Sequence, residues 1–448
     1  MRGDLTQGPI LKTLLLFALP MIAGNLLQQC YNIADTLIVG RFLGTAPLAA
    51  VGSSFTVMTF LTSVLLGLCM GSGALFSIRF GQRDWDGLRE GIFTAFLLIA
   101  LITLALTALV SAGLEEILVF LQVPEEVQPF MGSYLAVIFT GLPATFLYNY
   151  FACLLRSVGN SVVPLLFLAG SSVVNILLDL WFILGLDRGV AGAAEATVIS
   201  QYLSGLGLAA YGWGRFPQPR PQARHRRIRR TVVGQIASFS LLTCIQQSVM
   251  NFGILLVQGL VNSFGAGVMA AFAAGVKIDA FAYMPVQDFG NAFSTFIAQN
   301  HGAGKGARIR RGLRDAACAA VLFSLAVSAA VWCLARPLMG LFVESEETAV
   351  VNIGVEYLRI EGDFYCGIGV LFLLYGLFRA LGRPGISVVL TVISLGTRVV
   401  LAYVLSALPA FGVTGIWWAV PIGWLLADAA GLFLLRRLLP RLIPSGRG

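Results

Sequence analysis

The stretch LLFALPMIAGNLLQQCYNIADTLIVG, residues 15–40, decides the class of fold. It is long enough to cross the hydrocarbon core of a bilayer, which takes roughly 20 helical residues at 1.5 Å each. Segments of this kind recur along the 448 residues, and about twelve of them fit with short connections. They lack the ten-residue alternation of a membrane β-barrel. The sequence therefore predicts an all-α, multi-pass membrane protein with twelve transmembrane helices.

The composition supports a surface that faces lipid. Apolar residues make up 57% of the chain and charged residues only 12%, about half the charged fraction of soluble domains. This excludes a soluble multidomain protein. The seven cysteines all fall in apolar stretches and form no C-x-x-C pair, which favours buried thiols over disulfides or metal ligands. We expect no cofactor.

The net charge of +8 follows the connections between the predicted helices. Lys and Arg concentrate in alternate connections, above all in residues 215–230 and 305–314. Basic loops stay on the cytoplasmic side of a membrane, so both termini are expected to be cytoplasmic. The positive charge is therefore explained by the topology of the chain in the membrane, and we expect no nucleic-acid partner. The predicted location is the plasma membrane, as a bacterial inner-membrane protein.

The two halves of the chain share a pattern. Residues 156–159 (RSVG) recur at 379–382 (RALG), and 189–192 (GVAG) recur at 412–415 (GVTG), both shifted by 223 positions. Between the halves lies a polar, proline-rich and basic stretch that is typical of a linker. The predicted domains are an N-lobe at 1–214, a cytoplasmic linker at 215–231 and a C-lobe at 232–448.

A duplicated unit of six spans has a consequence for symmetry. Because six is even, both copies enter the membrane from the same side, which predicts a pseudo-twofold axis along the membrane normal. Transporters built in this way bind substrate between their halves and rock one half against the other.

Three parts of the sequence carry a family resemblance: residues 7–44, residues 282–305 (AYMPVQDFGNAFSTFIAQNHGAGK) and the paired R-x-x-G loops. Through them nearly the whole chain resembles the multidrug and toxic compound extrusion (MATE) transporters. The resemblance implies a V-shaped pair of six-helix lobes, and export of cationic or amphiphilic organic compounds in exchange for H⁺ or Na⁺.

A polar stripe runs along the first predicted span. Asn25, Gln28, Asn32 and Asp35 follow spacings of three and four residues and so share one helical face. An ionisable group inside a span costs several kcal/mol unless it is paired or hydrated, which makes Asp35 a functional candidate. The alternative is that Asp35 lies at the outer interface and is hydrated there.

Two further spans carry polar groups at a matching depth. Asn175 and Asp179 are four residues apart in the fifth span, and Thr197 lies in the sixth. Counted from the helix ends, their depths agree with that of Asp35 within roughly two helical turns. Two carboxylates in a poorly hydrated pocket do not both ionise easily, as a proton carrier requires. The same oxygens could instead hold Na⁺, and both ions stay open.

The resemblance adds roles for individual residues. In the DinF-like branch of MATE transporters, the positions matching Asp35, Asn175, Asp179 and Thr197 form the cation or proton site. It further implies that Tyr31 and Tyr134 are hydrogen-bonding neighbours of that site and that Gln28 and Asn149 line the substrate cavity. The polar stripe adds Asn32 to this supporting set. Pro20 resembles the proline of the family's first helix. It removes a backbone donor and can let the helix kink when Asp35 changes protonation, or it can form a static packing kink.

The second half departs from this pattern. The position equivalent to Asn175 is Arg398, the position equivalent to Asp179 is Ala402, and the seventh span holds no carboxylate. The N-lobe is therefore the expected coupling site. Asp288 and Asp363 are weaker candidates for cation or substrate binding in the C-lobe.

Two other functions are compatible with a multi-pass membrane protein. A lipid-linked saccharide flippase of the same superfamily shares the fold, but its cavity is markedly basic, whereas the N-lobe spans hold Asp35, Asp179 and Glu195. An intramembrane enzyme would need a motif such as H-E-x-x-H or G-x-S-x-G, and neither occurs. We therefore expect a transporter and not an enzyme, with small organic cations or amphiphiles as partners, embedded in the lipid bilayer as a monomer.

Overall fold

The computed structural model describes residues 4–121, 123–215, 221–225, 228–343 and 347–443. These residues form helices and no strand. The helices of the first half of the chain, followed by its π- and 3₁₀-helical turns, are α1 (Ile10–Leu43), α2 (Thr45–Gln82), α3 (Trp85–Ala112), α4 (Leu114–Phe120), α5 (Gln128–Phe139), α6 (Leu142–Ser157), α7 (Val162–Leu180), α8 (Gly189–Arg215), η1 (Trp181–Gly185) and η2 (Ala223–His225).

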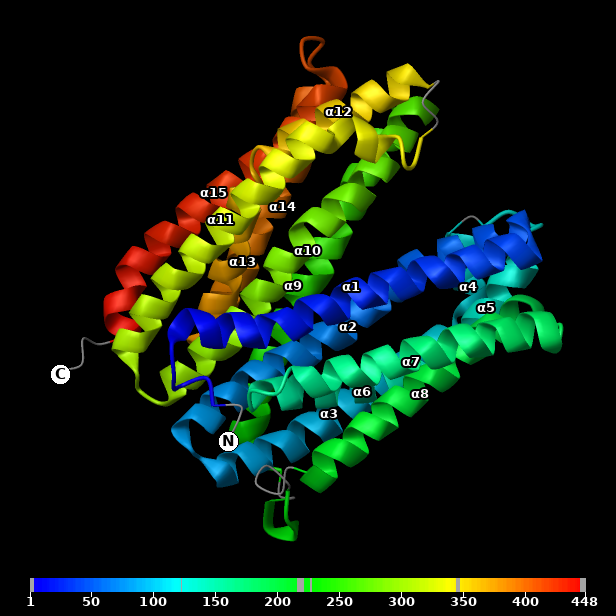
Figure 1. The fold of residues 1–448 in the computed structure, drawn as a ribbon. Helices are drawn as coiled ribbons and strands as arrows, with labels where there is room; N and C mark the ends of the chain where they lie inside the picture. The colour runs from blue at the N-terminus through cyan, green and yellow to red at the C-terminus, as the bar shows by residue number, and fades with distance from the viewer. Residues whose placement is uncertain (1–3, 122, 216–220, 226–227, 344–346, 444–448) are drawn as a thin grey trace. The chain divides into compact units, whose positions relative to one another are not determined.

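The second half contains seven further helices (Figure 1). They are α9 (Arg230–Asn262), α10 (Ala266–Gly302), α11 (Gly306–Met339), α12 (Thr348–Gly362), α13 (Tyr365–Ala380), α14 (Pro384–Ser406) and α15 (Gly412–Leu442). In the described residues, nine single helices are long and apolar enough to cross a membrane. Two bent pairs, α5 with α6 and α12 with α13, raise that number to eleven. The 27 residues of α8 are long enough for a twelfth span, so the predicted all-α membrane fold is confirmed.

The duplication is visible in the helix boundaries. The bent pair α5 and α6 breaks between Phe139 and Leu142 by 46°, and the pair α12 and α13 breaks between Gly362 and Tyr365 by 51°. The two breaks are 223 positions apart, which is the shift of the repeated motifs. The two halves therefore repeat a local geometry as well as short motifs.

The R-x-x-G loops have a structural reason. Gly159 and Gly382 adopt φ angles of 86° and 75°, a left-handed conformation that favours glycine. Each ends a helix with a 2.9 Å bond from the following residue, Asn160 to the carbonyl of Leu155 and Arg383 to that of Phe378. Glycine at this position of a helix end satisfies carbonyls that would otherwise lack donors.

Contacts divide the described residues into two compact units. The first contains Ala23–Cys244, and the second contains Leu5–Ile22 together with Ile245–Gly448. The boundaries thus fall inside α1 and α9, the first helix of each half. The predicted domains follow the duplicated sequence and not these contacts, so their limits at 214 and 232 stay a prediction. Within the predicted linker, positions 216–220 and 226–227 lie outside the described residues.

Part of the linker is bound to the first unit. His225 is buried, and its Nε2 lies 2.9 Å from Asp86 Oδ1 near the start of α3. The backbone N–H of Gln222 donates to His225 Nδ1 at 3.1 Å. This buried histidine therefore ties the chain after α8 to the start of α3.

The N-terminal segment packs with the second unit. The backbone N–H of Leu5 donates to Gln299 Oε1 at 3.0 Å, and Asn300 Nδ2 donates to the carbonyl of Leu5 at 3.2 Å. Lys305 Nζ donates to the carbonyl of Thr6 at 2.7 Å. These bonds come from the end of α10 and the loop that follows it, so polar residues within 299–305 hold Leu5 and Thr6 in place.

Candidate functional site in the first unit

The first unit brings four predicted site residues into one buried cluster. Asp35 comes from α1, Asn175 and Asp179 from α7, and Thr197 from α8. All four side chains are buried, and Asp179 is fully inaccessible. Helices α7 and α8 are neighbours, which is why residues 22 positions apart in the sequence can meet.

Asn175 connects α7 to α8. In the amide orientation that satisfies both of its ends, its Nδ2 donates to Asp179 Oδ2 at 3.1 Å. Its Oδ1 then accepts from Thr197 Oγ1 and from the Thr197 backbone N–H, both at 3.2 Å. A buried polar group costs free energy unless it is hydrogen-bonded, so this network fixes the relative position of the three side chains.

The carboxyl groups of Asp35 and Asp179 lie within hydrogen-bonding reach of each other. Two carboxylates cannot hydrogen-bond unless a proton lies between them, because an ionised carboxylate only accepts. One further oxygen of each residue, Oδ1, is buried without a partner among the described residues. Two buried acidic side chains from different helices, α1 and α7, therefore lie side by side.

Two tyrosines, which the family resemblance implies as neighbours of the site, lie beside the cluster. Tyr31 lies one turn before Asp35 on α1, and its hydroxyl hydrogen-bonds with Thr197. Tyr134 of α5 is buried beside Asp35, Tyr31 and Asp179. Two hydroxyl groups thus lie near the carboxyl pair.

Three predicted residues make their contacts elsewhere. Asn32 donates to Gln29 of the same helix at 3.2 Å, and Asn149 donates to the carbonyl of Thr145 at 2.9 Å. Gln28 is exposed. Nothing in these contacts brings the three residues to the carboxyl pair, and their predicted place in a substrate cavity stays a prediction.

Local backbone features lie on both sides of the cluster. The π-helical turn η1 begins two residues after Asp179, and the N–H of Leu186 bonds to the carbonyl of Trp181 at 3.0 Å. Such turns often occur at functional sites. On α1, the helix continues through Pro20, two residues before the chain passes from the second unit into the first. Proline has no N–H to give to the preceding turn, so the helix is weakest there.

A second buried polar cluster lies in the other unit. Asp279 of α10 lies beside Glu361 of α12 and Tyr365 of α13, and Arg398 of α14 is the nearby cation. Tyr357 of α12 lies beside the same carboxyl groups. The hydroxyl of Tyr365 is buried without a hydrogen-bond partner among the described residues. Asp279 and Glu361 are both buried. Two acidic groups therefore meet here too, with an arginine beside them.

Asp279, Glu361 and the two tyrosines beside them are not among the residues predicted from the sequence. Lys277, two residues before Asp279, is exposed and lies 6.0 Å from the ring of Phe342. A usable signal was the spacing of Tyr357 and Glu361, four residues apart on one face of α12.

The predicted C-lobe candidates occupy different environments. Asp288 of α10 is buried, whereas Asp363 is exposed at the break between α12 and α13. Neither is among the groups that lie beside Asp279 and Glu361. Within the described residues, no group of three or more His, Cys, Asp or Glu side chains could hold a metal ion.

Comparisons with known proteins match the duplicated pattern. The MatE family model matches residues 20–181 and again residues 242–404. The second match begins 222 positions after the first, in agreement with the repeated motifs and helix breaks. Together the two matches cover well over half of the chain.

Individual relatives align along almost the full length. The chain is 30% identical to the "Probable multidrug resistance protein YpnP" of Bacillus subtilis, over 97% of this chain and 96% of the relative. It is 27% identical to the "FAD transporter" of Shewanella oneidensis, with coverage of 98% and 97%. A solved structure of a MOP superfamily transporter from Pyrococcus furiosus superimposes with a TM-score of 0.92 at 23% identity, over 98% of both chains.

Proposed function

Because this chain belongs to the MatE family of membrane transporters, we propose that it is a secondary active exporter of cationic or amphiphilic organic compounds. It exchanges them for H⁺ or Na⁺ by alternating access between its two halves. The multidrug resistance protein named among its relatives supports the cargo class. We further propose that it acts as a monomer in the bacterial inner membrane with both termini in the cytoplasm.

The observation that carries this proposal is the buried carboxyl pair of Asp35 and Asp179 on two different helices. A carboxyl group inside a membrane span is costly to keep charged. Binding of a proton or a sodium ion removes that cost, and its release restores it. Whether a cation is bound to the pair therefore changes the free energy of the conformation in which the pair is buried.

The proposed cycle follows from this linkage. A cation that reaches Asp35 and Asp179 favours the state in which the pair is shielded from water, and the organic compound is released. Binding of the next organic compound favours the cation-free state. Pro20 is the proposed point at which α1 bends between the two states, because its missing donor makes that position the easiest to deform.

The test is efflux of a fluorescent cationic dye from vesicles that contain the purified protein. A pH gradient and a sodium gradient are imposed separately, and wild type is compared with Asp35→Asn and Asp179→Asn. We expect each variant to lose at least about ten-fold in gradient-driven efflux, because an amide takes up no proton and has no negative charge to balance a bound cation. Undiminished transport in both variants would contradict the assignment.

Asp187→Asn is the matched control. Asp187 is exposed and adopts a φ of 50°, a conformation that Asn tolerates well. The same chemical change at this position should leave efflux unaltered. Flavin nucleotide export, measured in the same vesicles, tests the cargo: if only the nucleotide moves, the cationic cargo class is wrong.

A further inference from the structure

Asp428 is a buried acidic residue near the middle of α15, a helix that is long and apolar enough to cross a membrane. The residue is 7% exposed, and its Oδ1 is buried without a hydrogen-bond partner among the described residues. An ionisable group inside a span is costly unless it is paired or hydrated. A buried polar atom without a partner therefore calls for an explanation.

No basic side chain pairs with Asp428 in the part of the chain that the structure describes. Helix α15 packs against α12, α13 and α14. A titratable side chain, Tyr375 of α13, lies near Asp428, and Thr391 and Ser394 of α14 lie beside this tyrosine. The charged side chains of the three helices lie against other groups, namely Arg359 against Trp332, Arg379 against Asn291, Glu356 against Thr414, and Glu361 and Arg398 beside Asp279.

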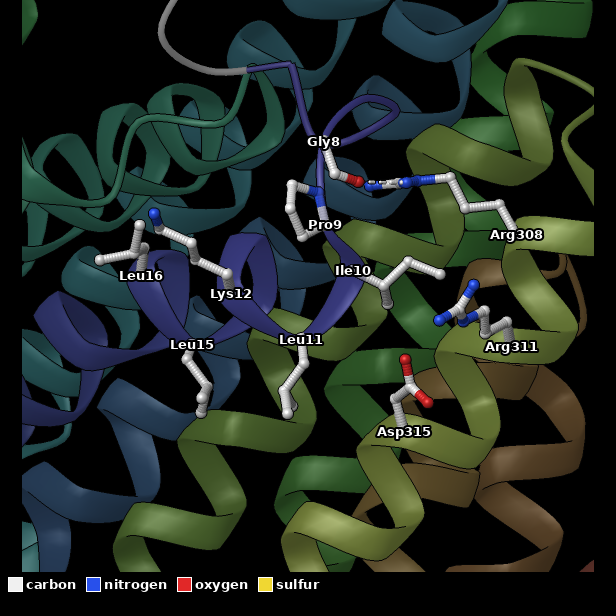
Figure 2. Close-up of a pocket in the computed structure, with 10 residues that line it drawn as sticks. All are labelled: Gly8, Pro9, Ile10, Leu11, Lys12, Leu15, Leu16, Arg308, Arg311 and Asp315. Atoms are coloured by element: carbon white, nitrogen blue, oxygen red, sulfur yellow. Dashed lines mark hydrogen bonds between the residues drawn. The ribbon is translucent and has the colours of Figure 1, made fainter.

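Charged groups at the surface of the same unit have partners. Figure 2 shows the groove between α1 and α11, in which Arg308 reaches to Gly8 and Arg311 is directed toward Asp315. The Arg308 guanidinium donates to the carbonyl of Gly8 at 2.6 Å. Asp315 thus has a basic side chain beside it, whereas the buried Asp428 has none among the described residues.

The first half of the chain has a glycine where the second half has Asp428. The shift of 223 positions that relates the repeated motifs also relates Asp428 to Gly205 and Gly367 to Ala144. A Cβ atom at Gly205 would lie 2.9 Å from the carbonyl oxygen of Ala144, so α8 and α6 pack closely there. In the second unit the glycine is on α13, and a Cβ atom at Gly367 would lie 3.6 Å from Asp428 Oδ2. Glycine thus suffices for the fold at this position, and a buried polar atom without a partner costs free energy, so stability does not explain Asp428.

The surroundings of Asp428 suit a proton better than a metal ion. The atoms nearest to the Cβ position of Gly367 are Asp428 Oδ2 and carbon atoms of Trp424 and Leu425. A hard metal ion takes several oxygen ligands, whereas a proton needs a single carboxylate oxygen. Within the described residues, Asp428 belongs to no group of three or more His, Cys, Asp or Glu side chains that could hold a metal ion.

We propose that Asp428 is a proton-binding site of the second unit, separate from the carboxyl pair of Asp35 and Asp179. Burial disfavours the charged form of a carboxyl group, so Asp428 holds a proton in this conformation. A conformation that hydrates the contact between α13 and α15 lets it release the proton to water. The second half then contributes a proton of its own to the export cycle, and this last step rests on the proposed function.

The test records the infrared absorption of protonated carboxyl groups in the purified full chain in lipid membranes while the pH is raised. Asp428→Asn should lack the absorption of one protonated carboxyl group that wild type shows. In wild type this band should fade as the pH rises, because the group loses its proton. The double variant Asp35→Asn, Asp179→Asn should keep the band. Asp428→Gly, which installs the residue of the equivalent position, should lose it as Asp428→Asn does and guards against a folding defect in one variant.

Asp187→Asn is the matched control, because the exposed Asp187 is ionised in water and contributes no such band. Identical bands in wild type and both Asp428 variants would overturn the proposal, since Asp428 would then be ionised. A band that stays constant over the whole pH range in which the protein is folded would also overturn it, because the acid would never release its proton. Loss of the band on addition of sodium chloride, but not choline chloride, at constant pH would show a metal-ion site instead. The measurement involves no transport, so its outcome is independent of the proposed export function.

Discussion

Asn175 of α7 and Thr197 of α8 are joined side chain to side chain, with Asn175 Oδ1 3.2 Å from Thr197 Oγ1. The same threonine hydroxyl bonds with Tyr31 of α1. One hydroxyl group therefore connects three helices at the carboxyl pair of Asp35 and Asp179. This makes Thr197 the residue at which the geometry of the cluster can be tested without changing its charge.

Thr197→Val keeps the shape of the side chain and removes its hydroxyl. We expect the variant to lose about 1–2 kcal/mol of stability, because Asn175 and Tyr31 each lose a buried partner. Dye efflux should fall together with the melting temperature. Thr197→Ser keeps the hydroxyl and should retain most of both. A fully active valine variant would show that this hydroxyl is dispensable.

Gly71→Ala tests the close approach of α2 to the first part of α9. A Cβ atom at Gly71 would lie 2.6 Å from Cα of Ser240, so the backbones must separate. Overpacking of this kind costs about 1–3 kcal/mol, and thermal unfolding should show the loss. Gly52 lies on the same helix with no neighbouring atom within 4 Å of its Cβ position. Gly52→Ala should therefore be neutral, and equal melting of both variants would refute the close contact.

Arg308→Ala should release the N-terminal segment. The side chain bonds to the carbonyls of Leu5, Gln7 and Gly8, and such charge-assisted bonds are stronger than neutral ones. We expect amide hydrogen exchange in residues 5–16 to accelerate by about ten-fold or more. Arg314→Ala, with the same loss of charge on the same helix, should leave exchange in this segment unchanged. Unchanged exchange in the Arg308 variant would contradict the docking.

Arg398→Asn tests the asymmetry between the halves. Arg398 is the cation beside Asp279 and Glu361, and the change installs the residue that stands at the equivalent position, Asn175. Loss of this cation should cost about 3–5 kcal/mol, because the two buried acidic groups are left without it. Sodium chloride, compared with choline chloride, should restore part of the melting temperature because a free cation can then replace the arginine.

The control for this exchange is Arg359→Asn. Arg359 is exposed and lies over the ring of Trp332, away from the acidic pair. Its loss should lower stability slightly and without a sodium response. If the Arg398 variant responds to sodium no more than wild type does, the arginine is not a substitute for a mobile cation.

The fold was largely predictable because its causes are local or periodic. Long apolar segments can satisfy their backbone groups in lipid only as helices, so the spans follow from composition. The glycines of the repeated loops, Gly159 and Gly382, end helices through their own backbone geometry. The cluster of Asp35 with Asp179 could also be expected. Helical spacing puts the polar residues of each span on one face, and lipid does not accept such a face. Because the two residues lie at similar depths in their spans, these faces can meet.

Other contacts depend on which helices become neighbours, and spacing alone carries no such information. Asp279, Glu361 and Arg398 come from three helices, and only their packing makes the acidic pair visible. The docking of residues 5–22 on the second unit and the burial of His225 likewise follow from tertiary contacts. The sequence by itself determined the helices and the carboxylates they carry. The tertiary structure decided which of those charges meet each other, because burial leaves a charged group no partner except the side chains that packing places beside it.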